Sequence, residues 1–98
     1  MKTQILLSDE KAEKVADGVA TVAKALREAG MPFVAAQLQP NEKVVDMDGL
    51  TALETRLGAA ERLMKLRPAE KPNQQKTIDF AVGVLKKRVT DAKGNGQF

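Results

Sequence analysis

The chain has 98 residues, with 16 lysines and arginines, 13 aspartates and glutamates, and no histidine, cysteine, tryptophan or tyrosine. Without cysteine and histidine, the sequence excludes thiolate or imidazole metal sites, disulfides, and nucleophile pairs of the Ser-His or Cys-His type. The length indicates one domain, and a composition that is 43% hydrophobic and 30% charged predicts a folded chain. Alanine, leucine and valine dominate the hydrophobic residues, which favours closely packed helices over a β-sandwich.

The first long helix is predicted over residues 9–29. Ser8 is a favoured N-cap residue, and Asp9 and Glu10 put carboxylates in the first turn, where the helix dipole stabilises them. Gly30 stands where a glycine commonly ends a helix. Apolar residues recur every three or four positions and so form one face: Ala12, Val15, Val19, Val22, Leu26 and Ala29.

A short fourth helical segment is predicted over residues 32–39, because Pro32 suits the first turn of a helix and apolar residues follow it. Pro40 and Asn41 then indicate a turn. Ahead of the first long helix, residues 1–7 are predicted to be an extended arm packed on the bundle, because the sequence offers no convincing partner strand for a sheet.

The second long helix is predicted over residues 48–67, with Asp46 or Asp48 as its N-cap and Pro68 just beyond its end. Its main apolar face consists of Leu50, Leu53, Leu57, Ala60 and Met64. A second apolar strip, about 140° around the helix, consists of Ala52, Ala59, Leu63 and Leu66. Two apolar faces predict a helix that is packed on both sides.

The third long helix is predicted over residues 73–93, with Asn73 or Thr77 as its N-cap. Its main apolar face consists of Ile78, Val82, Leu85, Val89 and Ala92. Phe80 and Val84 lie off this face. Residues 94–98, which include two glycines, are predicted to be a flexible tail.

Together these elements predict an all-α fold. Residues 1–98 are expected to form a single domain, a small bundle of three long helices with the short segment inserted after the first. Apolar spacing close to a heptad repeat predicts shallow crossing angles between neighbouring antiparallel helices.

No motif for catalysis or cofactor binding is evident. The glycines are scattered, and none begins the Gly-Lys-Ser/Thr of a phosphate-binding loop. Asp46 and Asp48 resemble a fragment of a calcium loop, but the further oxygen ligands are missing and helix capping explains both residues. Carboxylate pairs such as Glu13 and Asp17 lie on polar strips among cations. We therefore expect no enzyme activity, cofactor, metal or small-molecule substrate.

Charge is distributed unevenly along the chain. Residues 1–49 carry six basic and eight acidic side chains, whereas residues 50–98 carry ten basic and five acidic ones. The candidate binding cations of the second half are Arg62, Lys65, Lys86, Lys87, Arg88 and Lys93. One interpretation is that these cations stabilise the ends of the helices through the dipole. The other is an electropositive surface for an acidic protein or for phosphates.

The extra apolar residues also have two interpretations. Phe80 and Val84 either lie beneath the 32–38 segment or the N-terminal arm, or form an exposed strip that meets a partner. Leu63 and Leu66 on the second long helix have the same two alternatives. A chain of 98 residues has little surface with which to cover both strips, which favours a partner.

The resulting hypothesis is a non-enzymatic macromolecular interaction protein. It would be an adaptor, inhibitor or assembly factor, of the kind that phages, plasmids and bacteria encode, and would bind a protein or a second copy of itself as a homo-oligomer. The alternative is a nucleic-acid-binding protein that contacts phosphates through the basic residues of the second and third long helices. The sequence has no apolar run of signal-peptide or membrane-span length, so a cytoplasmic protein with no membrane partner is expected.

Overall fold

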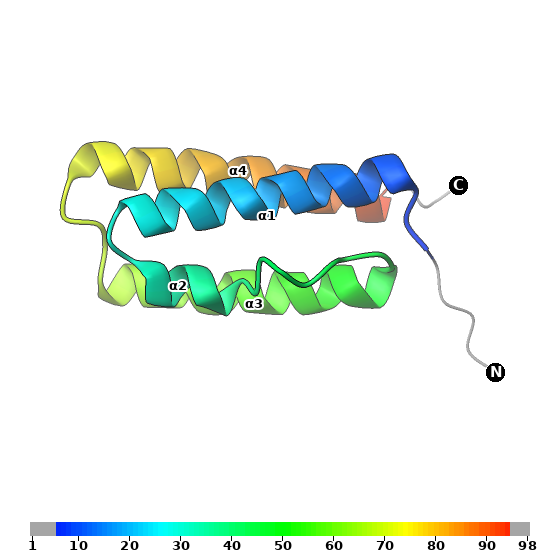
Figure 1. Cartoon of the computed structure of the whole chain (residues 1–98), viewed down its shortest axis with the longest axis horizontal. Coiled ribbons are helices and arrows are strands. Elements are labelled where there is room, and N and C mark those ends of the chain that lie inside the picture. Colours follow the sequence, from blue (N-terminus) through cyan, green and yellow to red (C-terminus); the bar gives the residue numbers. More distant parts are fainter. Residues whose placement is uncertain (1–5, 95–98) are drawn as a thin grey trace.

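A computed structural model describes residues 6–94 of the chain, and these residues form a helical bundle (Figure 1). Its elements are α1 (Asp9–Glu28), α2 (Pro32–Gln37), α3 (Met47–Leu66) and α4 (Pro72–Gly94). The prediction of an all-α fold with three long helices and one short one is confirmed, with helix ends within two residues of those expected. Most of the predicted arm and tail, residues 1–5 and 95–98, lies outside the described residues.

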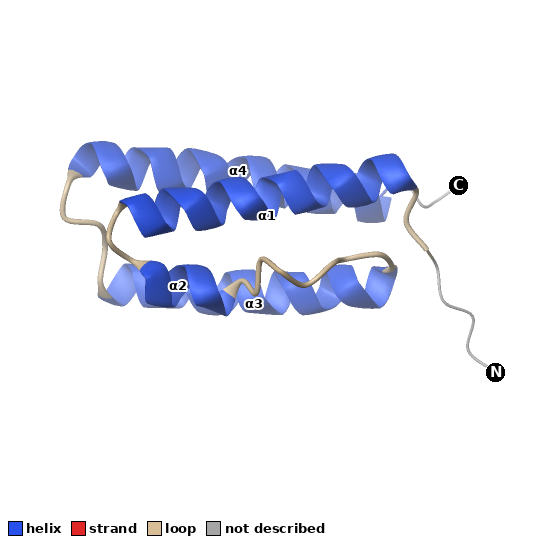
Figure 2. Cartoon of the chain, in the orientation of Figure 1, coloured by secondary structure: helices blue, strands red, loops and turns tan. Residues whose placement is uncertain are grey.

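The chain passes four times along the bundle. It runs down α1, returns through α2 and an extended segment, runs down α3 and returns through α4 (Figure 1). In the view of Figure 2, α1 and α2 lie in front of α4 and α3 respectively. α1 packs against α4 and α2, and α3 packs against α2 and α4. Each long helix thus lies antiparallel to its neighbours, and one position of the bundle is part helix and part extended chain.

One hydrophobic core joins the helices. The predicted apolar faces of α3 and α4 are buried in full, and on α1 the buried residues include Val15, Val22 and Leu26. Of residues 6–94, no polar or charged residue is buried. Burial of apolar surface therefore holds the bundle together. Among the described helices, none combines the length and apolar character needed to cross a membrane.

Two of the predicted helix caps are confirmed. The hydroxyl of Ser8 accepts a hydrogen bond from the backbone N–H of Lys11 at 3.2 Å, and Asp46 Oδ1 accepts one from the N–H of Gly49 at 2.8 Å. Gly30 follows α1 with a φ of 77°, which glycine adopts at little cost.

The predicted N-cap of α4 is wrong. Asn73 and Thr77 both lie inside the helix, and the Thr77 hydroxyl donates to the Asn73 carbonyl at 3.0 Å. The helix starts instead at Pro72, whose ring fixes φ near the helical value. The carbonyl of Lys71 accepts the first hydrogen bonds, from Gln74 and Gln75.

The segment before α1 makes a short contact with the segment before α3. Leu7 N–H donates to the Val45 carbonyl at 2.9 Å, and Leu6 forms an isolated antiparallel bridge with Asp46. Leu7 also packs on the core. Of the predicted arm the structure describes only these two residues, and Leu6 is 68% exposed.

α1 and α4 approach each other closely at Gly18. A Cβ at this position would lie 3.0 Å from Leu85 Cδ1 and 3.5 Å from Leu85 Cα. Leu85 is fully buried, so it has little room to move. Packing against Leu85 therefore favours glycine at this position, in spite of its low helix propensity.

Substitution of two helix-interior glycines should have opposite effects. Gly18→Ala forces a methyl group against Leu85 and is expected to lower the free energy of unfolding by about 1–2 kcal/mol. Gly58→Ala meets no atom within 4 Å and is expected to raise it by about 0.5–1 kcal/mol, because alanine is the better helix former. Urea unfolding followed by circular dichroism measures both effects. Equal stabilisation by the two substitutions would contradict the close packing at Gly18.

Candidate interaction surface

The second apolar strip of α3 is divided between core and solvent. Leu63 and Ala59 are half-buried, and Leu63 packs on the core. Ala52 is exposed, and Leu66 has 83% of its surface exposed. The prediction that α3 packs on both sides is therefore correct only near Leu63, and Leu66 is left facing solvent.

Of the two interpretations of Phe80, the one in which other segments cover it is wrong. Phe80 has 76% of its surface exposed, and Val84 is half-buried. At about 100° per residue, Phe80 lies on the side of α4 opposite the fully buried Ile78 and Leu85. α2 lies diagonally across the bundle from α4, so it cannot reach this side (Figure 2).

Three of the six candidate cations bind other helices of the same bundle. Lys86 Nζ lies 2.8 Å from Glu61 Oε2, and Lys93 Nζ lies 2.8 Å from Glu54 Oε1, so both lysines join α4 to α3. Arg88 Nη1 donates to the backbone carbonyl of Lys14 on α1 at 3.0 Å. The partners are 25, 39 and 74 residues away in sequence, so no local pattern indicated them.

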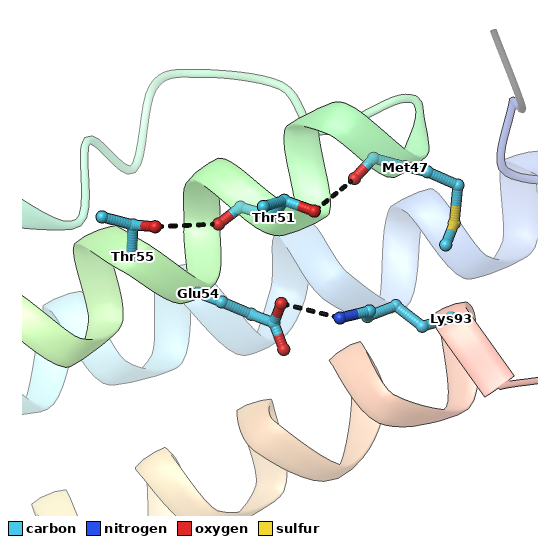
Figure 3. A network of polar contacts seen from close by, with 5 residues as sticks. All are labelled: Met47, Thr51, Glu54, Thr55 and Lys93. Carbon is cyan, nitrogen blue, oxygen red and sulfur yellow. Dashed lines mark hydrogen bonds and ion pairs between the residues drawn. The ribbon is translucent and has the colours of Figure 1, made fainter.

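Figure 3 shows the contact between Glu54 and Lys93 together with the polar side of α3. Glu54 extends towards α4, where it meets Lys93. Thr51 and Thr55 instead donate their hydroxyl protons to the carbonyls of Met47 and Thr51, both at 3.2 Å. These threonines satisfy their hydrogen bonding within α3 and leave Glu54 to join the two helices.

A shallow groove separates α3 from α4. It contains two cavities of about 280 and 270 Å³, and Glu61 lines both of them. The buried side chains of Leu57 and Val89 line the first cavity, and the Glu61–Lys86 ion pair borders it. In residues 6–94, no three acidic side chains are grouped so that they could hold a metal ion.

A basic and apolar surface lies at the C-terminal end of α3. It consists of Arg62, Lys65, Leu66 and Arg67, all exposed, and is called the α3-end patch below. Within the part of the chain that the structure describes, the three cations of the patch make no ion pair and no side-chain hydrogen bond.

The α3-end patch borders a cavity of about 390 Å³ between the α1–α2 turn and the α3–α4 linker. Arg67 and the 44% exposed Phe33 of α2 line this cavity from two sides. Neither residue was among the candidates chosen from the sequence. For Phe33 the sequence did contain a signal, the shortness of α2, because a helix of six residues can bury only part of its apolar surface.

A second exposed surface lies on the outward side of α4. It includes Phe80, the half-buried Val84 and the exposed Lys87, and is called the α4 face below. The side chain of Lys87 has no ion-pair or hydrogen-bond partner among residues 6–94. Of the ten candidate residues, six thus lie on the two exposed surfaces, one packs on the core and three bind other helices.

Comparisons with known proteins place this chain in no family. Neither a protein-family model, nor a curated protein sequence, nor a solved structure matches it. Inference about function therefore rests on the surfaces of the bundle.

The ion pair between Glu61 and Lys86 should make a small contribution to stability that depends on salt. A double-mutant cycle with Glu61→Gln and Lys86→Met is expected to give a coupling energy of about 0.2–1 kcal/mol at low salt, since both side chains are partly exposed. The coupling should shrink as ionic strength rises. A parallel cycle with Lys87→Met in place of Lys86→Met is the control and should give no coupling. Equal coupling in both cycles would contradict the specific pair.

Proposed function

We propose that the protein is a non-enzymatic interaction protein that docks the α3-end patch onto an acidic and apolar surface of a partner protein. The observation that carries the proposal is the environment of Leu66. This large apolar side chain is 83% exposed and stands beside three cations that have no counter-ion within the described bundle. A single exposed leucine is common on protein surfaces, so it is the combination with unpaired cations around it that supports a binding surface.

The energies of the patch favour a binding role over a purely structural one. Cations in the last turn of a helix stabilise it by about 0.3–1 kcal/mol each through the dipole, which gives Lys65 a reason to be there. The helix dipole does not explain why an apolar residue, Leu66, is exposed in the same turn. Burial of a leucine against a partner contributes about 1.5–3 kcal/mol, whereas free cations at the rim mainly speed association and select acidic partners.

Phe33 and the neighbouring cavity extend the same surface. An apolar side chain of the partner that entered the cavity of about 390 Å³ would contact Phe33 and Met31 at its wall. Arg67 lines the cavity and can form a bidentate pair with a carboxylate of the partner. The patch and the cavity together provide an apolar anchor and a charged contact, the combination found at energetic centres of interfaces. For such an adaptor, inhibitor or assembly factor we propose a cytoplasmic setting, which the absence of cysteine from the sequence supports.

Nucleic-acid binding is the second candidate, and the contacts of the basic residues favour it less. Lys86 and Lys93 are neutralised by carboxylates, and Arg88 is bound to a backbone carbonyl. Arg62, Lys65 and Lys87 remain for phosphates, on two different helices.

Replacement of Leu66 by serine should weaken the partner complex without unfolding the bundle. We expect Leu66→Ser to raise the dissociation constant about tenfold or more, because the loss of 1.4 kcal/mol of binding energy corresponds to a factor of ten. The partner is first captured from an extract of the native host and then purified for titration. Ala52→Ser, also exposed on α3, is the matched control. A captured protein that binds both variants as tightly as the original chain would contradict the proposal.

The nucleic-acid alternative predicts a steep salt dependence. Binding of a labelled duplex, followed by fluorescence anisotropy, should weaken with a log–log slope of about 0.9 for each phosphate contact. Arg62→Gln combined with Lys87→Gln should reduce that slope by about two contacts. If no binding occurs at low salt, the alternative is wrong and the protein partner stands alone.

A further inference from the structure

On the outward side of α4, a row of residues continues beyond the α4 face towards both ends of the helix. Six residues share this side of the helix, at steps of three or four except for one adjacent pair: Lys76, Phe80, Gly83, Val84, Lys87 and Asp91. At about 100° per residue they fall within an arc of about 100° on the helix surface. This arc lies opposite the buried residues of α4, so the rest of the bundle leaves five of its six residues exposed and only Val84 half-buried.

The charged members of this arc have no partners within the chain. Lys76, Lys87 and Asp91 are exposed and form no ion pair or side-chain hydrogen bond among residues 6–94. The other lysines of α4 differ from them, because Lys86 and Lys93 are paired with α3. Along the arc, a cation therefore stands at one end and an anion at the other, with an aromatic ring and a glycine between them.

We propose that the occupant of this surface is a second copy of the chain, paired through α4 in an antiparallel, two-fold arrangement. An axis placed between residues 83 and 84 puts Lys76 opposite Asp91 of the second copy. The same axis puts Phe80 opposite Lys87 and Gly83 opposite Val84. By symmetry each contact occurs twice, as in any isologous interface.

Each of these three contacts is favourable. Lys76 and Asp91 carry opposite charges, so the pairing neutralises both ends of the arc. The ammonium and apolar stem of Lys87 can cover the exposed ring of Phe80. A Cβ at Gly83 would meet no atom within 4 Å in the chain itself, so this glycine leaves room for the side chain of Val84 from the second copy. A parallel pairing would place like charges opposite each other and is disfavoured.

The paired surface is small. One face of a 23-residue helix is smaller than the patch of about 800 Å² per partner in a standard interface. We therefore expect a reversible dimer with a dissociation constant of about 10–100 µM. The inference does not depend on the α3-end patch, which lies on another helix.

Charge reversal tests the register directly. Analytical ultracentrifugation of the whole chain should show a concentration-dependent shift from 10.6 kDa to twice that mass. Lys76→Glu alone and Asp91→Lys alone should each raise the dissociation constant about tenfold or more, because each puts like charges opposite each other twice. An equimolar mixture of the two variants should form a mixed dimer with an affinity within about threefold of the original, since both pairs then have opposite charges.

Controls distinguish this interface from other surfaces. Leu66→Lys changes an equally exposed residue of the α3-end patch and should leave the dimer intact, whereas Phe80→Asp should abolish it. All of these positions are exposed, and circular dichroism checks that the variants remain folded. A chain that stays monomeric at about 1 mM, well above the expected dissociation constant, overturns the inference. So does a mixture of the two charge variants that stays monomeric, or a dimer that Leu66→Lys disrupts and Lys76→Glu does not.

Discussion

The close approach of α1 to α4 at Gly18 determines which surfaces of the bundle remain open. Because Gly18 has no side chain, Leu85 packs directly against the backbone of α1, and Arg88 reaches the Lys14 carbonyl one turn away. One flank of α4 is thus packed against α1. The other flank is joined to α3 by the ion pairs of Lys86 and Lys93. With the core on its inner side, α4 has only its outer side left, and Phe80 lies there.

The shortness of α2 also leaves apolar surface exposed, on the side of the bundle diagonally opposite α4. Its six residues bury Val34 and Ala35, and the chain then continues as an extended segment. An extended segment covers α3 less fully than a helix would, because it presents fewer side chains to each turn of its neighbour. Phe33 of α2 remains 44% exposed and lines the cavity of about 390 Å³. The exposure of Phe33 and that of the outer side of α4 are thus both consequences of how the helices close the core.

Much of the fold follows from short-range patterns in the sequence. The burial of Leu50, Leu57 and Leu85 follows from apolar spacing, and the caps at Ser8 and Asp46 follow from side-chain chemistry within three residues. The N-cap of α4 was harder to predict, since Asn73 competes as a cap with a proline that already fixes the first turn.

Less of the candidate site could be predicted from the sequence. The second apolar strip of α3 was identified as one unit, yet Leu63 packs on the core and Leu66 does not. Which basic residues are free depends on partners far along the chain, as for Lys93 and Glu54. Helical periodicity shows which residues share a side of a helix. It does not show where a neighbouring helix lies, and this position decides exposure and pairing.

The two proposed surfaces support each other if both are occupied. The α3-end patch lies beside the linker that leads into α4, so an antiparallel pairing of α4 puts the two patches at opposite ends of the dimer (Figure 1). Their separation along the axis is then roughly the length of α4, about 35 Å at 1.5 Å per residue. A partner with two acidic, apolar sites at that spacing would bind both patches at once and gain avidity without any new contact. Such a partner would in turn stabilise the weak dimer by mass action, because it binds the paired form more tightly than the single chain. Dimerisation through α4 and docking through α3 would then be coupled, although no residue belongs to both surfaces.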